Sequence, residues 1–432
     1  MTQRRILRTL ALALTLAMML GACGSGWASE APVELRAVWW GGAARNDMMN
    51  AIYDRYQELN PNVTIIREYS EWNDYWIKYS TQLAGGNPPD VIQFTDRELH
   101  SFVGQNAAVD LTPYVESGVL DMSNFNESAL AAGTIEGKLY MVAMGLSTPV
   151  LEYNKTVLDE VGLGLPGDEM SWDEFTAYLK AVVDSGKLPE GMYPLADPST
   201  DGAWFESYLR QFGKSLTDEG GSLNFGKDDA IGYFQWLEDM RQAGVVPPYS
   251  VTAEFDGKPK EESQIIAKVV AMFCVAGNQT KIYQNNMEDT LAIARLPIAP
   301  GQANPHGEVV MGAYLSVSPT SKNIEEAVKV VDFFVNDIEA NRIFNCEQGI
   351  PGSTAVQEGI QDLLHPLDVR VTELLNETLK DIPAPQPRPS GTVEIYSAIK
   401  ATNELIAYGQ MSVDAAVAQF VADCQQILEE AR

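Results

Sequence analysis

The stretch GKLYMVAMGLSTPVLEYNK, from Gly137 to Lys155, determines how we expect the rest of the chain to be arranged. The apolar run from Leu139 to Ala143 is typical of a buried strand, and residues 145–149, which contain Gly and Pro, interrupt it. Residues 150–153 resume a strand-like pattern before a helix begins near Lys155. Because such a break lets the backbone change direction, the stretch predicts a crossing from one α/β lobe into another. A loop within a single domain is the alternative.

Ser147 and Thr148 lie in the break itself. A crossing between two lobes borders any cleft between them, so a ligand in that cleft could reach both hydroxyls. The length also favours two lobes, because the 432 residues exceed what one hydrophobic core usually organises.

The first residues have the pattern of a removable export signal. Arg4, Arg5 and Arg8 precede an apolar run, residues 10–20, that is too short to span a membrane as a mature helix. Small residues then lead into Cys23, in the order Leu-Gly-Ala-Cys. This order resembles the bacterial lipoprotein signal, which implies that residues 1–22 are removed and that Cys23 becomes lipid-modified. An ordinary secretory signal with a chance Cys is the alternative.

The net charge of the chain excludes one class of binding partner. The formal net charge of -29 repels phosphate backbones and anionic lipid headgroups, which excludes nucleic acid as a partner. Residues 23–32, rich in Gly, Ser and Ala, predict a flexible tether. The later thiols, Cys274, Cys346 and Cys424, permit either one disulfide or three free thiols, and Cys424 falls on the apolar face of a predicted helix.

Strands and helices alternate after the tether. Residues 33–40 predict a first strand that ends in Trp39-Trp40-Gly41-Gly42, followed by a helix capped by Asn46 or Asp47. Two further predicted strands, residues 63–66 and 91–94, flank a second helix. This βαβ order predicts a mostly parallel sheet. Farther along, Ser171 and Glu174 have the spacing of a capping box.

Four stretches together resemble the extracytoplasmic solute-binding proteins of ABC importers, family 1, the carbohydrate group related to maltose-binding protein. They are AGGNPPDVIQF (84–94), the Gly137–Lys155 stretch, SWDEF (171–175) and LSVSPTSKNIEEAVKVVDFF (315–334). The resemblance implies an α/β fold of two lobes, with a hinge between them and the ligand in the interlobe cleft. It places residues 33–144 and 306–350 in the N-terminal lobe, and residues 145–305 and 351–432 in the C-terminal lobe.

The same resemblance implies a function. A protein of this kind captures a sugar or short oligosaccharide by hinge closure and delivers it to the transmembrane subunits of an ABC permease. It needs no cofactor, and we expect it to act as a monomer that is held at the membrane through Cys23.

Sugar recognition requires aromatic faces for the ring and planar polar groups for the hydroxyls. Trp40 ends the first predicted strand, and Glu71 and Trp72 lie in a loop before a helix. Asp96 and Arg97 follow the strand at 91–94 and match positions where the family contacts hydroxyls, although a helix cap and a surface ion pair would explain them equally well.

Trp204 and Phe205 match an aromatic position that the family uses for stacking, and a core helix face is the alternative. Asn278 stands where many relatives carry Trp, so an amide would meet a hydroxyl edge instead of a ring face. Similarly, Ser147 and Thr148 stand where maltose-binding relatives carry an acid, which argues against a maltodextrin ligand. The remaining candidates lie in the return strand and the last region: Gly312, Tyr314 and Tyr396.

Other functions have less support. The three histidines, His100, His306 and His365, have no partner at metal-ligand spacing, and the sequence contains neither a G-x-S-x-G elbow nor an H-E-x-x-H pair. A carboxylate pair for glycoside hydrolysis remains an alternative in so acidic a chain. A binding site for a polyamine or metal cation is another, but Arg97 and the tryptophans favour a neutral sugar.

Overall fold

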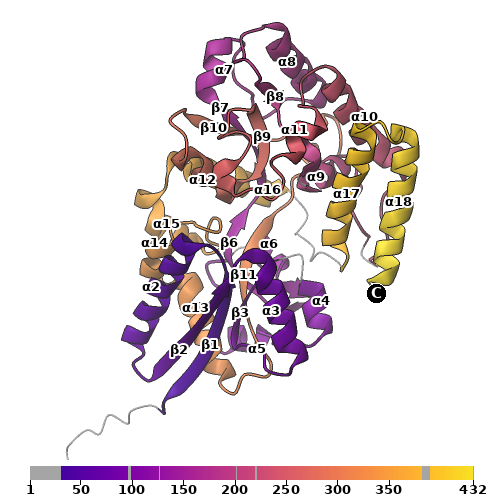
Figure 1. Ribbon diagram of the computed structural model, residues 1–432. Helices are drawn as coiled ribbons and strands as arrows, with labels where there is room; N and C mark the ends of the chain where they lie inside the picture. The colour runs from indigo at the N-terminus through magenta and orange to yellow at the C-terminus, as the bar shows by residue number, and fades with distance from the viewer. Residues whose placement is uncertain are drawn as a thin grey trace, which may run out of the picture.

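The computed structural model describes residues 31–431, except 96–98, 126, 201, 219–220 and 382–389. Within these residues the chain forms two α/β lobes, one above the other in Figure 1, which confirms the predicted fold class. The predicted signal peptide, Cys23 and most of the tether lie outside the described residues, as do Asp96 and Arg97. No described helix is long and apolar enough to cross a membrane.

The N-terminal lobe is built on a five-stranded sheet with the order β2-β1-β3-β11-β6. Strand β1 pairs in parallel with β2 and β3, whereas β11 runs antiparallel to β3 and β6, so the sheet is mixed. The parallel half follows from the βαβ order, and the antiparallel half arises because a distant segment returns to the same sheet. Its strands are β1 (Val33–Trp40), β2 (Val63–Ser70), β3 (Val91–Thr95), β6 (Val142–Ser147) and β11 (Met311–Val317).

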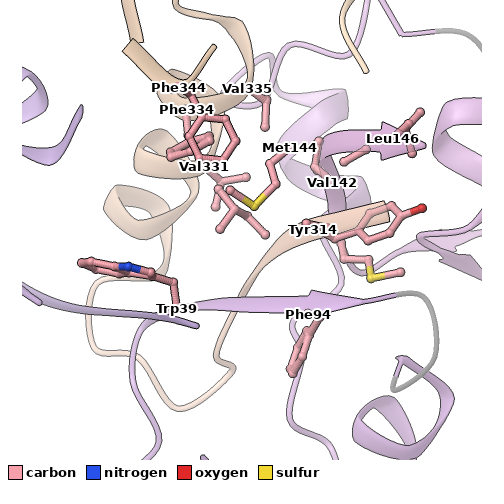
Figure 2. Packing of buried hydrophobic residues seen from close by; sticks show 14 of the residues in the cluster. Trp39, Phe94, Val142, Met144, Leu146, Tyr314, Val331, Phe334, Val335 and Phe344 are labelled. Atoms are coloured by element: carbon pink, nitrogen blue, oxygen red, sulfur yellow. The ribbon is translucent and has the colours of Figure 1, made fainter. Parts of the chain in front are cut away.

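Helices cover both faces of this sheet. One core layer holds Val331, Phe334 and Phe344, and Phe94 lies on the other side of the strands in Figure 2. There the Phe94 ring stacks on Phe102. The elements around the sheet are α2 (Ala43–Leu59), α3 (Trp72–Ala84), α4 (Leu99–Gly104), α5 (Thr112–Glu116), α6 (Glu127–Ala131), β4 (Thr134–Ile135), β5 (Lys138–Leu139), α13 (Ile324–Asn336), α14 (Ile338–Phe344) and α15 (Thr354–Ile360).

Helix α2 begins earlier than we predicted. Its N-cap is Gly42, not Asn46 or Asp47, and its first helical residue is Ala43. The Asn46 side chain has a different use, because it accepts a hydrogen bond from Trp39 Nε1 (2.8 Å) and donates one to the Gly41 carbonyl (3.1 Å). This pair of bonds fixes the end of β1 against α2, one residue before Trp40.

The C-terminal lobe has a four-stranded sheet with the order β10-β7-β9-β8, in which β7 is antiparallel to both neighbours. The predicted capping box is confirmed, because Ser171 and Glu174 exchange hydrogen bonds at the start of α8. The elements of this lobe are β7 (Pro149–Asn154), α7 (Lys155–Val161), α8 (Trp172–Asp184), β8 (Tyr193–Leu195), η1 (Pro198–Thr200), α9 (Gly202–Gln211), α10 (Lys227–Gln242), α11 (Tyr249–Ala253), η2 (Lys260–Glu262), β9 (Val270–Ala276), η3 (Gly277–Gln279), α12 (Thr280–Asn285), β10 (Leu291–Ala294), α17 (Thr392–Ala407) and α18 (Val413–Glu430).

The stretch that suggested a crossing does connect the two sheets, but its break is shorter than predicted. Strand β6 continues through Gly145 to Ser147, and only Thr148 separates it from β7. Gly145 serves a close approach instead of a turn, since a Cβ there would lie 2.6 Å from the Gln348 carbonyl oxygen. The two sheets are therefore joined by an almost continuous strand.

Two segments depart from the predicted lobe boundaries. Residues 145–147 belong to the sheet of the N-terminal lobe, and α15 packs against α13 and α14 of that lobe, although we assigned both to the C-terminal lobe. The buried Val356 and Ile360 explain the position of α15, because they join the core of the N-terminal lobe. After η4 (Gln361–Leu363), helix α16 (Pro366–Asp381) packs on α12, η3 and β10 of the C-terminal lobe.

The cysteines form no disulfide among the described residues. Cys274 is half-buried, and Cys346 and Cys424 are buried. The prediction that Cys424 belongs to a helical core is confirmed by its place in α18.

Candidate functional site

A cluster of three tryptophans lies at the carboxyl end of β1. We call Trp40, Trp72 and Trp76 the N-lobe tryptophan cluster. The Trp40 ring meets Trp72 edge-on, with centroids 5.0 Å apart, and Trp76 lies 5.8 Å from Trp40. Trp40 is buried, but 38% of Trp72 is exposed, which makes Trp72 the ring of this cluster that can meet a ligand. Glu71 is exposed beside it and approaches Gly42 at the start of α2.

Gln93 lies beneath this cluster, and sequence reasoning missed it. The side chain is fully buried on β3, accepts a hydrogen bond from the Trp40 amide (3.3 Å) and donates to the Gln348 side chain. A buried amide in an apolar strand is a signal that could have found it, because burial of an amide is costly unless its hydrogen bonds are satisfied. Gln93 thus links Trp40 to a distant part of the chain.

That distant part, residues 345–350, we call the junction segment. Asn345 and Cys346 both have positive φ angles, 46° and 55°, which non-glycine residues rarely adopt. Backbone strain of this kind persists only where surrounding contacts impose it. The contacts come from both lobes, because Lys281 of α12 donates to the Asn345 carbonyl (2.8 Å) and Leu146 of β6 pairs with Ile350.

Arg45, on the first turn of α2, is a second residue that the sequence did not single out. Its Nε bonds Glu347 of the junction segment at 2.7 Å, and its Nη1 donates to the Trp40 carbonyl at 3.1 Å. The guanidinium is therefore held beside the tryptophan cluster. It places a fixed guanidinium fork next to the Trp40 backbone.

On the crossing between the lobes, the structure brings three predicted residues together. Ser147 and Thr148 are both buried, and the Ser147 hydroxyl accepts a hydrogen bond from the backbone N–H of Asn278 (3.0 Å). The Thr148 carbonyl accepts from the Gly277 amide, but its hydroxyl has no hydrogen-bond partner among the described residues. Asn278 is half-buried at the end of β9. These polar groups lie where the two sheets meet.

The structure corrects our prediction for Trp204 and Phe205. Both are buried in the core of the C-terminal lobe, with exposures of 1% and 0%, so no ring face is left for a ligand. Trp204 belongs to what we call the C-lobe tryptophan cluster, in which it stacks on Trp236 at 6.3 Å and meets Trp172 edge-on at 6.1 Å. The core face of the helix, which we gave as the alternative, is where these rings lie.

Tyr396 forms a polar contact group with two residues of α9. Its hydroxyl donates to Glu206 on α9 (2.6 Å), and Arg210 lies 3.8 Å from the same carboxylate. The Tyr396 ring covers Gly202, where a Cβ would clash with it. Figure 1 shows α9 and α17, which carry these residues, on the side of the C-terminal lobe that faces the N-terminal lobe.

Gly312 and Tyr314 are neighbours on β11. Tyr314 is fully buried, and a Cβ at Gly312 would lie 2.9 Å from its ring, so the glycine makes room for the tyrosine. This packing gives Tyr314 a place in the core, which corrects the prediction that it reaches a ligand. Asp96 and Arg97 lie outside the described residues.

Three of the predicted residues lie together at one end of the N-lobe sheet. Trp40, Glu71 and Trp72 lie together at the carboxyl ends of β1 and β2, where α/β proteins hold ligands. Among the described residues, no group of three or more His, Cys, Asp or Glu side chains is placed to hold a metal ion. The exposed Trp72 indole, with the exposed Glu71 next to it in the chain, can bind a ring face and its polar edge.

Comparison with known proteins gives the family. The family model described as bacterial extracellular solute-binding protein matches residues 51–363. The chain belongs to this family. The resemblance predicted from the four stretches is thereby confirmed.

Curated relatives of this solute-binding protein are distant in sequence. An arabinooligosaccharide-binding protein of Bacillus subtilis is 26% identical over 297 residues, which are 67% of this chain and 64% of the relative. The diacetylchitobiose binding protein of Streptomyces coelicolor is 22% identical over 340 residues, which cover 76% of this chain and 75% of the relative. A binding protein of Brucella abortus is 24% identical, and the match spans 66% of its length and 64% of this chain.

Solved structures of similar proteins share the fold. A periplasmic solute binding protein from Pectobacterium atrosepticum superposes with a TM-score of 0.82 at 23% identity, covering 92% of this chain and 99% of the other. A periplasmic oligogalacturonide binding protein from Yersinia enterocolitica, in complex with saturated digalacturonic acid, gives 0.79 with the same identity and coverage.

Proposed function

We propose that this protein is the extracytoplasmic receptor of an ABC importer, and that it captures a sugar or short oligosaccharide for delivery to a membrane permease. The observation that carries the proposal is the N-lobe tryptophan cluster. It presents the partly exposed Trp72 ring at the carboxyl end of β2, next to the exposed Glu71, and the Arg45 guanidinium is bonded to the Trp40 carbonyl of the same cluster. Relatives that bind arabinooligosaccharide and diacetylchitobiose add support.

Binding and closure would be coupled through the ligand. A sugar on Trp72 buries one ring face and leaves its other face and edge for groups of the C-terminal lobe, such as Asn278 and the Glu206–Tyr396 pair. Because those contacts form only when the lobes approach, the ligand favours the closed state by its difference in affinity for the two states. Ser147 and Thr148, at the crossing between the lobes, would contribute small hydroxyl groups to the binding of the ligand.

Three further parts of the proposal concern the chain as a whole. We propose that it is anchored through a lipid on Cys23, that it acts as a monomer, and that it binds without catalysing a reaction. A membrane anchor would keep the receptor near its permease and raise its effective concentration there. Detection of a lipid on the N-terminal peptide by mass spectrometry tests the anchor directly.

A thermal-shift screen tests the central proposal. The full chain without residues 1–22 is heated in the presence of neutral oligosaccharides, acidic oligosaccharides and polyamines, and hits are confirmed by calorimetry. A ligand at 100 times its dissociation constant stabilises the native state by about 2.7 kcal/mol, which gives a readily measured rise in Tm. Stabilisation by a saccharide, without turnover of that saccharide, is the expected result.

Two results would contradict the proposal. Stabilisation by polyamines alone would make the protein a cation receptor, and release of shorter saccharides from a substrate would make it a hydrolase. Polyamines and saccharides differ in charge and shape, so one plate distinguishes these outcomes.

A further inference from the structure

The junction segment, residues 345–350, lies against the strand that joins the two lobes. Leu146 of β6 and Ile350 exchange two backbone hydrogen bonds, each 2.7 Å long, and β7 of the C-terminal lobe begins three residues after Leu146. Gly349 has a φ of 125°, and a Cβ there would lie 2.5 Å from the Leu146 carbonyl oxygen, so this contact requires glycine. The segment is therefore held in close contact with the crossing between the lobes.

The Trp40 amide of the N-lobe tryptophan cluster is connected to this segment through two side chains. The pairing of β1 with β3 ends at Val38 and Ile92, so the Trp40 N–H lies beyond that ladder. The Gln93 side chain accepts a hydrogen bond from it at 3.3 Å and donates one to Gln348 of the segment. Both glutamines are buried, and a buried amide is costly to leave unpaired, so each holds the other in place.

The Trp40 carbonyl is connected to the neighbouring residue of the same segment. Arg45 Nη1 donates to this carbonyl at 3.1 Å, and Arg45 Nε donates to Glu347 at 2.7 Å. The side chains of Arg45 and Glu347 are only 16% and 19% exposed, so salt screens their attraction less than it would screen an exposed pair. Both polar backbone groups of Trp40 are thus bonded to side chains that adjacent residues of the junction segment hold.

The C-terminal lobe binds the first residue of the segment. Lys281 Nζ of α12 donates to the Asn345 carbonyl at 2.8 Å and pairs with the buried Asp368 of α16 at 2.9 Å. Figure 1 shows α12 above α14, the helix that leads into the segment. Between this contact and Glu347 lie the positive φ angles of Asn345 and Cys346, 46° and 55°. Because such angles persist only where surrounding contacts impose them, loss of the Lys281 contact should release the segment.

We propose that the junction segment couples the interlobe contact of Lys281 to the position of Trp40, with Glu347 and Gln348 as positioning residues for the N-lobe tryptophan cluster. The inference deepens the proposed function and rests on it, because this cluster is the proposed place of the sugar. The Trp72 ring packs on Trp40 with centroids 5.0 Å apart, so a shift of Trp40 changes the surface that a sugar meets. A ligand that favours one arrangement of the lobes then also favours one arrangement of the cluster.

Exchange of the Trp40 amide hydrogen with solvent measures this coupling without a ligand. The chain contains eight tryptophans, so isotope labelling of tryptophan alone gives a backbone spectrum in which single amides can be followed. In Lys281→Met the Trp40 amide should exchange about threefold to tenfold faster, because its hydrogen bond opens more often. The tryptophan amides of the C-terminal lobe, at Trp172, Trp204 and Trp236, should keep the rates of the parent protein.

Two further variants make the measurement specific. Lys268→Met is the matched control, because Lys268 also pairs with an aspartate of the C-terminal lobe, Asp289 at 2.8 Å, but has no ion pair with the junction segment among the described residues. It should leave the Trp40 rate unchanged. Glu347→Gln keeps the size of the side chain and weakens the bond to Arg45, so it examines the other end of the connection even if Lys281→Met does not fold. Combined with Lys281→Met it should give less than the product of the two single effects, because both act through one segment.

Calorimetry relates the coupling to binding. Arabinotriose and diacetylchitobiose are suitable probes, because two relatives are named as binding proteins for saccharides of these classes. Affinity for the better of the two should fall about threefold or more in Lys281→Met and in Glu347→Gln, and less than about twofold in Lys268→Met.

Faster exchange at Trp40 together with weaker binding is the expected result. An unchanged Trp40 rate in both variants overturns the inference, and so does equal acceleration at all tryptophans, which would show only a loss of global stability. Faster exchange with unchanged affinity also overturns it but leaves the proposed function intact. If the parent protein binds neither these probes nor any saccharide of the thermal-shift screen, the proposed function fails, and the exchange rates still decide whether the segment couples the lobe contact to Trp40.

Discussion

The two lobes each contain a cluster of three tryptophans, and the clusters differ in what they leave exposed. In the N-terminal lobe the cluster ends at Trp72, which is 38% exposed at a sheet edge. In the C-terminal lobe Trp204 is 1% exposed, and Trp172 and Trp236 are half-buried. Edge-on contacts at similar distances occur in both clusters, so the geometry of the rings does not distinguish a binding surface from a core. The distinction depends on what surrounds the rings.

One glutamate on a strand of each lobe also shows how surroundings determine behaviour, in this case the pKa of a carboxyl group. On β2, burial alone would raise the pKa of Glu68, but hydrogen bonds from Lys78, Arg36 and Gln82 outweigh it and lower the pKa to about 2. On β7, Glu152 is fully buried and neither carboxylate oxygen has a hydrogen-bond partner among the described residues, so burial raises its pKa well above 4.5. Acid should therefore affect the two lobes in opposite directions.

The largest effect should come from Trp204→Ala, because it removes the most deeply buried ring of the C-lobe tryptophan cluster. We expect a loss of about 3–5 kcal/mol in the free energy of unfolding, measured by urea denaturation. Trp204→Phe is the matched control and should cost much less, since the indole N–H has no hydrogen-bond partner among the described residues. A stable Trp204→Ala protein that no longer binds ligand would reverse the roles of the two clusters.

Glu152→Met should stabilise the protein. Its cross-strand neighbours are Phe273 and Ile293, so an apolar side chain of similar length should raise the free energy of unfolding by about 1–3 kcal/mol at pH 7. In the parent chain, stability is fully present below the ordinary glutamate pKa of 4.5, and it falls as pH rises towards the higher native pKa. Unfolding measured from pH 4 to 8 should show that decline only in the parent. A destabilised variant would reveal a partner for this carboxyl group.

Trp72→Ala should remove ligand affinity with little change in stability. Because the ring is half-exposed, we expect less than about 1 kcal/mol of destabilisation, and a loss of affinity of about tenfold for the sugar that binds best. Calorimetry and thermal unfolding measure the two effects on one sample. Phe212→Ala, at an exposed ring of the C-terminal lobe, serves as control and should leave affinity unchanged. Unchanged affinity in Trp72→Ala would remove the basis for a sugar platform.

Thr176→Val probes how the C-lobe tryptophan cluster is held. The Thr176 hydroxyl accepts a hydrogen bond from Trp236 Nε1 at 2.8 Å, and its loss leaves that N–H without an acceptor. The cost should be about 1 kcal/mol in urea denaturation. Affinity should not change, and a change would mean that the cluster communicates with the ligand site.

The smallest effect should come from Glu68→Gln. Its ion pairs with Arg36 and Lys78 are partly exposed, so their loss should cost about 0.5–1 kcal/mol at pH 7. Because the native pKa is lowered, this stability is present above the ordinary pKa of 4.5 and is lost as pH falls towards about 2. Denaturation curves at pH 7 and pH 3 should therefore differ less in the variant. An equal difference would assign the acid sensitivity to other groups.

Local features of the sequence predicted local structure well. The capping box of Ser171 and Glu174 and the first strand, Val33–Trp40, each depend on residues that are close in the chain. The sequence could not show which of Trp72 and Trp204 is exposed, because both lie on helices in the structure and only the tertiary neighbours cover one of them. The prediction that Asn46 caps a helix was wrong for a similar reason. Its side chain binds the Trp39 indole instead of a backbone N–H at the start of the helix.

The candidate site was predictable only in part. Trp40 was found at the end of a predicted strand, and Glu71 and Trp72 in a loop before a predicted helix. In contrast, Gln93, Arg45 and Glu206 act through residues 53 to 302 positions away, apart from the bond of Arg45 to the nearby Trp40 carbonyl and the pairing of Glu206 with Arg210. The contacts of Gln93 and Glu206 join helices and strands that are far apart in the sequence, so no short sequence motif contains both partners. A single sequence contains no signal for such pairs beyond the presence of a buried polar side chain.

Cys346 offers a native reporter of motion between the lobes. Burial, with the nearby Asp368, raises the pKa of its thiol to about 12, so a thiol reagent can label it only when the junction segment opens. Cys424, buried in the core of the C-terminal lobe, should become reactive only on unfolding of that core. Peptide mapping after timed alkylation would resolve the two thiols. The ratio of their labelling rates, with and without a ligand, would measure how often the two lobes separate transiently at the junction segment in the unmodified protein.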